Sequence, residues 1–263
     1  MENGLKISDI NSIASMQQGT KEGIIDRRFL LIVVFARPLL LFLAHLITAG
    51  VFTVLGDKAP FHTAGPYWSV YGTLTDIGCL LLLHVGVRKE GIRLIDLICF
   101  DKKRLLKDIF FGIGIGVAGG LIMMLLSSKL AGIIAYGTLT PVFPEGSFTR
   151  QLPLWAVLYG RSIWLIIWSP TEELIYNGYS LPRLQAALGS KWKALLLVSF
   201  SFSLMHCFLP IINLQHALYM FIMFVPLTLF LGLMYMRFKR LTPLIVGHWL
   251  MDMGNVYFMT TTL

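Results

Sequence analysis

Long apolar runs, separated by short polar stretches, make up most of this chain. The runs lie at residues 29–55, 67–87, 109–126, 154–168, 194–210, 217–236 and 244–258. A helix needs about 20 mostly apolar residues to cross the hydrocarbon core of a bilayer. Most of the runs have about this length, so the pattern predicts seven transmembrane helices. Within the first run, Arg37 is expected to snorkel to the membrane surface and Pro38 to kink the helix.

Basic residues are concentrated between the apolar runs. They gather in segment 88–108, at Lys191 and Lys193, and in segment 237–240. Cytoplasmic loops of membrane proteins are rich in Lys and Arg. The alternation of basic and non-basic connections therefore predicts a cytoplasmic N-terminus and a C-terminus on the outer side. The long loop 127–153 has room for a short span or re-entrant piece around 130–139, which would raise the number of spans to eight.

Composition narrows the class of protein further. The chain has 263 residues, of which 56% are hydrophobic and 14% charged, with a mean hydropathy of +0.72. About a quarter of the residues in a soluble domain are charged, so this is an integral membrane protein. The net charge of +8 lies between spans, where it orients the chain, and nucleic-acid binding is excluded. We expect an all-α bundle of about 7–8 transmembrane helices, with a cytoplasmic segment 1–28 before a single domain 29–263.

Two adjacent glutamates, Glu172 and Glu173, follow the short run at 154–168. Fifteen residues at 1.5 Å each span about 22 Å, which is less than the hydrocarbon core. The span is therefore expected either to continue through the glutamates or to break near Ser169 and Pro170. A structural explanation is that residues 169–172 form a capping box with proline at the first helical position. The functional explanation is that ionisable residues at membrane depth are costly and usually mark a site.

Two later runs offer partners for these carboxylates. Phe202 and His206 are four residues apart and share one helix face, and so do His248 and Asp252. A carboxylate one turn from an imidazole can orient the ring and fix its tautomer. The structural alternative is that both histidines only make hydrogen bonds between helices.

Ionisable groups in a membrane bundle avoid lipid and converge on its interior. There, a carboxylate could deprotonate water while imidazoles stabilise an oxyanion. A metal-activated water is the alternative chemistry, with Glu172, His206 and His248 as ligands, for example of zinc. The sequence contains no HExxH motif, so the spacing does not identify zinc.

The ordered motifs resemble a known family. Glu172-Glu173 is followed by Tyr176 and Gly178, then by Phe202-x-x-x-His206 and by His248-x-x-x-Asp252. This resembles, over about residues 154–258, the CPBP family of CAAX proteases and bacteriocin-processing or Abi proteins, which includes the type II CAAX prenyl endopeptidases.

The resemblance implies a helical intramembrane endopeptidase without an obligatory cofactor. It implies that Glu172 is the general base on water and that His206 assists it. His248 and Asp252 would stabilise the tetrahedral oxyanion, with Glu173 beside them. The side chains expected to line the substrate cavity are Phe202, Tyr176 and Asn177.

Two positions depart from the family pattern. The first motif of the family usually reads EExxxR, whereas this chain has Asn177 at the last position. An arginine there would neutralise or orient a glutamate, most directly Glu173, and Arg161 and Arg183 are too far along the helix to replace it. Asp252 occupies a position that is often Asn, so beside an oxyanion it must be protonated or must serve to orient His248.

The expected function is hydrolysis of a peptide bond in a membrane-associated protein or peptide, prenylated or not. The first alternative is a non-catalytic protein of the same fold that acts in bacteriocin immunity or abortive infection. The second is a proton-coupled transporter, for which inverted repeats would be expected; we find none in the sequence. The expected partners are membrane lipid and a protein or peptide substrate, and the expected location is the cell membrane.

Overall fold

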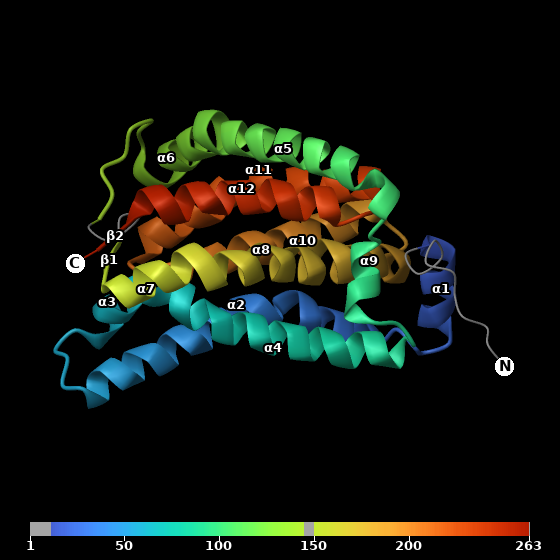
Figure 1. Cartoon of the computed structure of the whole chain (residues 1–263), viewed down its shortest axis with the longest axis horizontal. Coiled ribbons are helices and arrows are strands. Elements are labelled where there is room, and N and C mark those ends of the chain that lie inside the picture. The colour runs from blue at the N-terminus through green and yellow to red at the C-terminus, as the bar shows by residue number, and fades with distance from the viewer. Residues whose placement is uncertain (1–11, 145–149, 263) are drawn as a thin grey trace.

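The computed structural model describes residues 12–144 and 150–262, and this part of the chain forms long helical rods lying side by side (Figure 1). The rods, in chain order, are α2 (Arg27–Val54); α3 (Pro60–Ala64) continued by η1 and α4 (Trp68–Lys89); α5 (Leu105–Leu121) continued to α6 (Ser128–Tyr136); α7 (Leu154–Tyr159) continued to α9 (Leu181–Leu188); α10 (Lys191–His206); α11 (Leu214–Phe238); and α12 (Thr242–Met259). The prediction of an all-α membrane bundle is confirmed.

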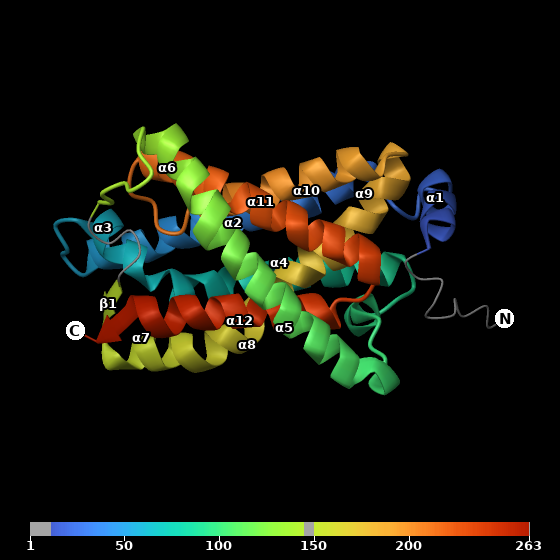
Figure 2. The same cartoon turned by 90° about the horizontal axis from the view of Figure 1, so that it is seen from above.

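Four helical stretches are long and apolar enough to cross a membrane by length and composition: Arg27–Val54, Pro60–Lys89, Leu94–Tyr136 and Leu214–Phe238. The rods at 154–188, 191–206 and 242–259 lie among them and carry the predicted site residues (Figures 1 and 2). The apolar runs of the sequence thus correspond to helical rods one for one.

The rod at 154–188 does not begin or break at the glutamates. It continues from α7 through the π-helical segment η5 (Gly160–Trp164), α8 (Leu165–Glu173) and the π-helical segment η6 (Leu174–Ser180) into α9. Pro170 lies inside α8, and the Ser169 hydroxyl donates a hydrogen bond to Asp252 instead of capping a helix. The capping-box interpretation is therefore wrong. The Ser-Pro-Thr-Glu sequence, which is typical of a helix start, lies here inside a continuous helix.

The predicted loop at 127–153 is also shorter than expected. The helix continues from α5 through the π-helical segment η4 (Ile122–Ser127) and α6, and ends at Tyr136 where Gly137 takes a left-handed conformation with φ 72°. The extra apolar piece at 130–139 is thus the continuation of the third rod and not a separate span.

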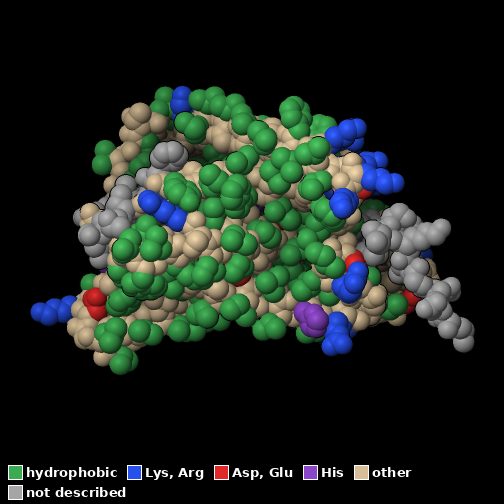
Figure 3. Space-filling model, in the orientation of Figure 1, with side chains coloured by type: hydrophobic (Ala, Val, Ile, Leu, Met, Phe, Trp, Pro, Cys, Tyr) green, Lys and Arg blue, Asp and Glu red, His purple; other side chains and the backbone are tan. Residues whose placement is uncertain are grey.

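The lateral surface of the bundle is apolar. Figure 3 shows hydrophobic side chains covering the flank between the two ends. Exposed large apolar side chains on the helices include Ile47, Leu81, Val117 and Ile166. Lysine and arginine side chains gather mainly at the end where the N-terminal helix α1 (Ile13–Lys21) lies (Figures 1 and 3). An apolar flank of this kind is stable in lipid and not in water, so the chain is a membrane protein.

A seam of glycines joins α5 to α12. A Cβ atom on Gly112 would lie 2.6 Å from the Val246 side chain, and one on Gly116 would lie 2.9 Å from the Gly247 carbonyl oxygen. A Cβ on Gly247 would in turn lie 2.8 Å from the Gly112 carbonyl oxygen. Small residues let the two backbones approach closely, as is common between membrane helices. The seam holds α12, the helix that carries His248, against α5.

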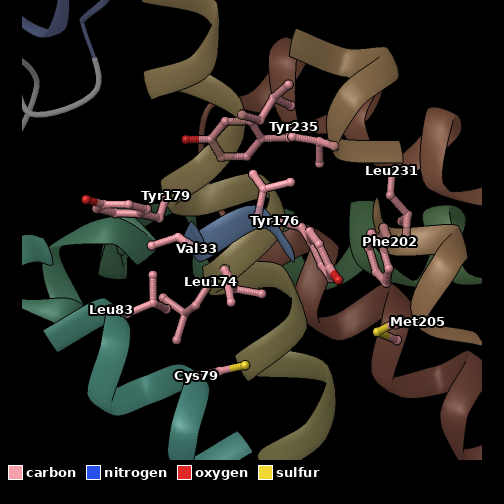
Figure 4. Close-up of a cluster of buried hydrophobic side chains, with 14 of the residues drawn as sticks. Val33, Cys79, Leu83, Leu174, Tyr176, Tyr179, Phe202, Met205, Leu231 and Tyr235 are labelled. Carbon is pink, nitrogen blue, oxygen red and sulfur yellow. The ribbon is translucent and has the colours of Figure 1, made fainter. Parts of the chain in front are cut away.

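The interior of the bundle is filled by large side chains from several rods. Figure 4 shows Val33, Leu83, Leu174, Tyr176 and Phe202 within one buried cluster. At the end of the bundle opposite α1, the strands β1 (Arg150–Leu152) and β2 (Thr260–Thr262) pair in parallel, with Arg150 opposite Thr260 (Figure 1). This short pair ties the start of the fourth rod to the end of the last.

Candidate active site

The two predicted glutamates lie in the middle of the bundle, where α8 faces α12. Glu172 and Glu173 are both fully buried. The imidazole of His248, from α12, lies between them, with Nε2 3.2 Å from Glu172 Oε2 and Nδ1 2.9 Å from Glu173 Oε1. Residues separated by 75 positions in the sequence thus meet at one ring. The structure brings both glutamates and His248 together, as the motifs predict.

Glu173 is held by neutral and ring donors. The Asn177 Nδ2 amide donates a hydrogen bond of 2.8 Å to Glu173 Oε2, while His248 Nδ1 contacts the other oxygen. Asn177 therefore keeps the contact expected for the missing arginine but brings no charge. His248 is oriented by Glu173, since this is the shorter of its two carboxylate contacts.

Glu172 has a different partner, which the sequence reasoning did not find. Arg37 Nη2 lies 3.2 Å from Glu172 Oε1, and Arg37 Nη1 lies 2.7 Å from Asp76 Oδ1. The guanidinium also lies 4.2 Å from the centroid of the Trp168 ring. Arg37 and Asp76 are fully buried, so the prediction that Arg37 snorkels to the membrane surface is wrong. Its charge is compensated inside the bundle by two carboxylates, and the long side chain does not need to reach water.

A signal for this pair was present in the sequence. Arg37 and Asp76 are opposite charges inside two consecutive apolar runs, and antiparallel neighbouring helices can place such residues at the same depth. The pair was missed because helix pairing, and not local spacing, brings Arg37 to Glu172.

Asp252 lies at the edge of the cluster. Its Oδ2 accepts a 2.6 Å hydrogen bond from the Ser169 hydroxyl and lies 3.9 Å from His248 Nε2. The second distance is too long for a hydrogen bond. Asp252 therefore ties α12 to α8, and the orienting contact to His248 comes from Glu173.

His206 reaches the cluster through aromatic rings. Its Nδ1 lies 2.9 Å from the Phe202 carbonyl oxygen, so Nδ1 carries the proton that is donated and Nε2 is left as an acceptor. The Phe202 ring centroid is 5.9 Å from that of His206 and 6.0 Å from that of His248. Tyr176 stacks on the same ring at 4.3 Å. Phe202 thus contacts both histidines and Tyr176, while among the described residues no direct hydrogen bond joins His206 to a glutamate.

The two arginines near the first motif serve other parts of the fold. Arg183 pairs with Glu90, with Nη2 2.5 Å from Glu90 Oε2, at the end of the bundle near α1. Arg161 Nη2 donates to the Thr260 carbonyl oxygen at 2.7 Å, next to the paired strands. Neither replaces the motif arginine, in agreement with their sequence separation.

A metal ion does not fit this arrangement of donors. Both nitrogens of His248 already face carboxylates, and the Arg37 cation lies against Glu172. Of the three ligands considered from the sequence, only the Nε2 of His206 lacks such a partner. Within residues 12–144 and 150–262 no group of three or more His, Cys, Asp or Glu side chains is arranged as a metal site.

Comparison with known families supports the motif assignment. Residues 150–254 match the family model described as type II CAAX prenyl endopeptidase Rce1-like. The matched segment contains Glu172, Glu173, His206, His248 and Asp252, and it does not extend to α2 or α4. Comparisons with curated proteins and with solved structures gave no match. The resemblance to CAAX-type endopeptidases inferred from the motifs is therefore confirmed over this segment.

Proposed function

We propose that the protein is an intramembrane endopeptidase that cleaves a peptide bond of a membrane-associated protein or peptide with a glutamate-activated water. The observation that carries this proposal is the His248 imidazole between two buried carboxylates, 3.2 Å from Glu172 and 2.9 Å from Glu173. A purely structural ion pair would need only one carboxylate beside the imidazole. An acid–base pair of this kind can move protons and stabilise an oxyanion in a water-poor interior.

In this mechanism Glu172 removes a proton from water, and the water is also held by the free Nε2 of His206. His248 donates a hydrogen bond to the carbonyl oxygen of the scissile bond as that oxygen becomes an oxyanion. Glu173 holds His248 by its Nδ1, and Asn177 holds Glu173. The hydroxide formed in this way adds to the carbonyl carbon. As the C–N bond of the tetrahedral intermediate breaks, the proton on Glu172 passes to the leaving amine. Glu173 and Asn177 already hold His248 in place, so this donor needs little reorganisation during the reaction.

Asp252 has a supporting role in this proposal. It is bonded to Ser169 and lies 3.9 Å from His248 Nε2, so as the neutral acid it would add a second donor for the oxyanion. As the charged form it would repel the oxyanion. The Phe202 and Tyr176 rings, stacked at 4.3 Å, are proposed to form one wall of the substrate cavity.

The membrane orientation follows from charge. Basic side chains gather at the end of the bundle that carries α1 (Figure 3), so we place this end in the cytoplasm by the positive-inside rule. The protein is then a multi-pass protein of the cell membrane with the N-terminus inside. The substrate is a peptide or protein segment that reaches the cytoplasmic half of the bilayer, prenylated or not.

The test is cleavage of a peptide panel by purified protein in liposomes. Prenylated and unprenylated C-terminal peptides are incubated with wild type, Glu172→Ala and His206→Ala, and products are followed by mass spectrometry. Wild type is expected to cleave at least one peptide. Both variants should lose cleavage by at least about a thousandfold, the upper range for a general acid–base group.

The matched control is His45→Ala, since His45 is a buried histidine that hydrogen-bonds Tyr71 outside the cluster. It is expected to cleave at the wild-type rate. Wild-type rates for Glu172→Ala or His206→Ala would refute the mechanism. Binding of peptides by wild type without any product would instead support the non-catalytic alternative.

A further inference from the structure

A cation from another helix lies beside the first motif, although not at the glutamate that Asn177 contacts. Arg37, on α2, is fully buried and lies 3.2 Å from Glu172. We infer that Arg37 is a positioning residue for the proposed general base and that Asp76 positions Arg37 in turn. This inference rests on the proposed function and extends the site to α2 and α4, outside the segment that matches the family model.

The balance of buried charges indicates that Arg37 does more than form a structural ion pair with Asp76. Arg37 and Asp76 alone would already be a neutral buried pair, with Nη1 to Oδ1 at 2.7 Å. Burying a third charge, Glu172, beside a neutral pair is costly and is not needed for stability. The guanidinium nevertheless lies with its second amino group toward Glu172. The cation is thus shared between a fixed counter-ion and the carboxylate that carries the proposed chemistry.

The two distances show how the charge is divided. Arg37 is nearer to Asp76, at 2.7 Å, than to Glu172, at 3.2 Å. Its contact with Asp76 meets the geometry of a hydrogen bond, whereas neither oxygen of Glu172 has a hydrogen-bond partner among the described residues. Asp76 therefore keeps the guanidinium from moving closer to Glu172. Glu172 is oriented by a nearby cation but keeps its lone pairs available to bind a water proton.

The surroundings of position 177 explain why the cation comes from elsewhere. Asn177 is buried, and its Oδ1 lies 3.7 Å from where a Cβ on Gly232 of α11 would be. Its amide already satisfies Glu173. A guanidinium at this place would need the space between η6 and α11, whereas the Arg37 side chain comes from α2 and its guanidinium lies 4.2 Å from the centroid of the Trp168 ring. The α2 arginine reaches Glu172, where a position-177 arginine would most directly meet Glu173.

The experiment compares Arg37→Gln, Arg37→Lys and Asp76→Asn with wild type on a peptide that wild type cleaves. Arg37→Gln is expected to lower kcat about a hundredfold with KM within about twofold, because a misplaced catalytic group costs about this much without changing substrate contacts. Arg37→Lys keeps the charge and should recover about tenfold of this loss. Asp76→Asn should also lower kcat, since Arg37 then closes on Glu172 and blocks its lone pairs.

The double variant Arg37→Gln/Asp76→Asn tests whether the two residues act as one unit. Its kcat is expected to equal that of Arg37→Gln within about threefold, because the role of Asp76 acts through Arg37. If the losses instead multiply, the assignment of Asp76 as the residue that positions Arg37 is wrong.

Arg183→Gln is the matched control, because Arg183 is also a fully buried arginine paired with a carboxylate, Glu90, away from the site. It is expected to lower the melting temperature and to leave kcat per folded molecule unchanged. Equal kcat losses in Arg183→Gln and Arg37→Gln, or a wild-type kcat for Arg37→Gln, would overturn the inference and leave the proposed function intact. Absence of any cleavage by wild type would overturn both.

Discussion

The bundle contains two buried arginine–carboxylate clusters that differ in how fully they are hydrogen-bonded. In the first, Arg183 holds Glu90 with contacts of 2.8, 2.9 and 2.5 Å and also donates to the Tyr179 carbonyl oxygen at 3.2 Å. In the second, Arg37 divides one charge between Asp76 and Glu172. The first cluster is a finished bidentate pair, of the kind that holds helices together.

In the second cluster, several of the described polar atoms have no hydrogen-bond partner. Its charges include Glu172, Glu173, Asp76 and Arg37, with His248 between the two glutamates. Within the described residues, both oxygens of Glu172 and one oxygen of Asp76 lack a hydrogen-bond partner. A buried polar group left in this state costs free energy. Stability alone would favour the arrangement found at Arg183, so the difference between the clusters supports the proposed catalytic role of the second.

The largest expected effect comes from replacing one glutamate in each cluster with glutamine. Glu172→Gln should abolish cleavage, by at least about a thousandfold, without lowering the melting temperature, since Arg37 keeps Asp76. Glu90→Gln should lower the free energy of unfolding by about 3 kcal/mol, because Arg183 is left as an uncompensated buried charge. Its kcat per folded molecule should stay at the wild-type value. The measurements are peptide cleavage and thermal unfolding in the same liposomes or detergent.

The opposite effects on stability and activity would contradict this comparison of the two clusters. A Glu172→Gln protein that melts well below wild type would mean that this cluster is mainly structural. A Glu90→Gln protein that is stable but inactive would place the Arg183 pair in the site.

A smaller effect is expected at Asp252, which belongs to the second cluster but is bonded to Ser169. Asp252→Asn preserves an acceptor for the Ser169 hydroxyl and fixes the group 3.9 Å from His248 Nε2 in an uncharged form. We expect kcat to stay the same or rise by up to about tenfold, as repulsion of an oxyanion is removed. A fall of more than a hundredfold would show that the carboxyl group itself takes part in proton transfer. Ser169→Ala is the control for the lost hydrogen bond alone.

The smallest effect is expected from removing metal. Since both nitrogens of His248 face carboxylates and Glu172 faces Arg37, treatment with EDTA or phenanthroline should leave the cleavage rate within about twofold. Loss of activity that returns on adding zinc would mean that the cluster rearranges around a metal during turnover. Melting curves with and without zinc provide a readout that does not depend on activity.

Much of the fold followed from the sequence because the membrane simplifies the problem. Apolar runs must be helices in lipid, since every backbone polar group has to be bonded internally. This predicted the rods and the all-α class. It did not predict the continuation of the third rod to Tyr136, because no local pattern distinguishes an apolar helix end from an apolar loop.

The sequence indicated the members of the cluster that belong to the ordered motifs, and it did not indicate Arg37 or Asp76. Glu172 and Glu173 are adjacent, and His248 meets them as the motif order suggests. The contact of Arg37 with Glu172 depends on which helices pack together, and local sequence does not contain that information. Asn177 was identified as a missing charge, but the structure shows that it still orients Glu173.

The two π-helical segments that flank α8 set the direction in which each part of the rod faces. A π turn holds one residue more than an α turn, and each residue of an α-helix turns the chain by about 100°. Deleting one residue from η6 would therefore rotate α9 by about a quarter of a turn relative to α8. Glu172 could still face α2 and α12, but Arg183 would point away from Glu90. The extra residue thus adjusts the rotation of α9 relative to α8, so that one rod directs Glu172 toward Arg37 and His248 and directs Arg183 toward Glu90.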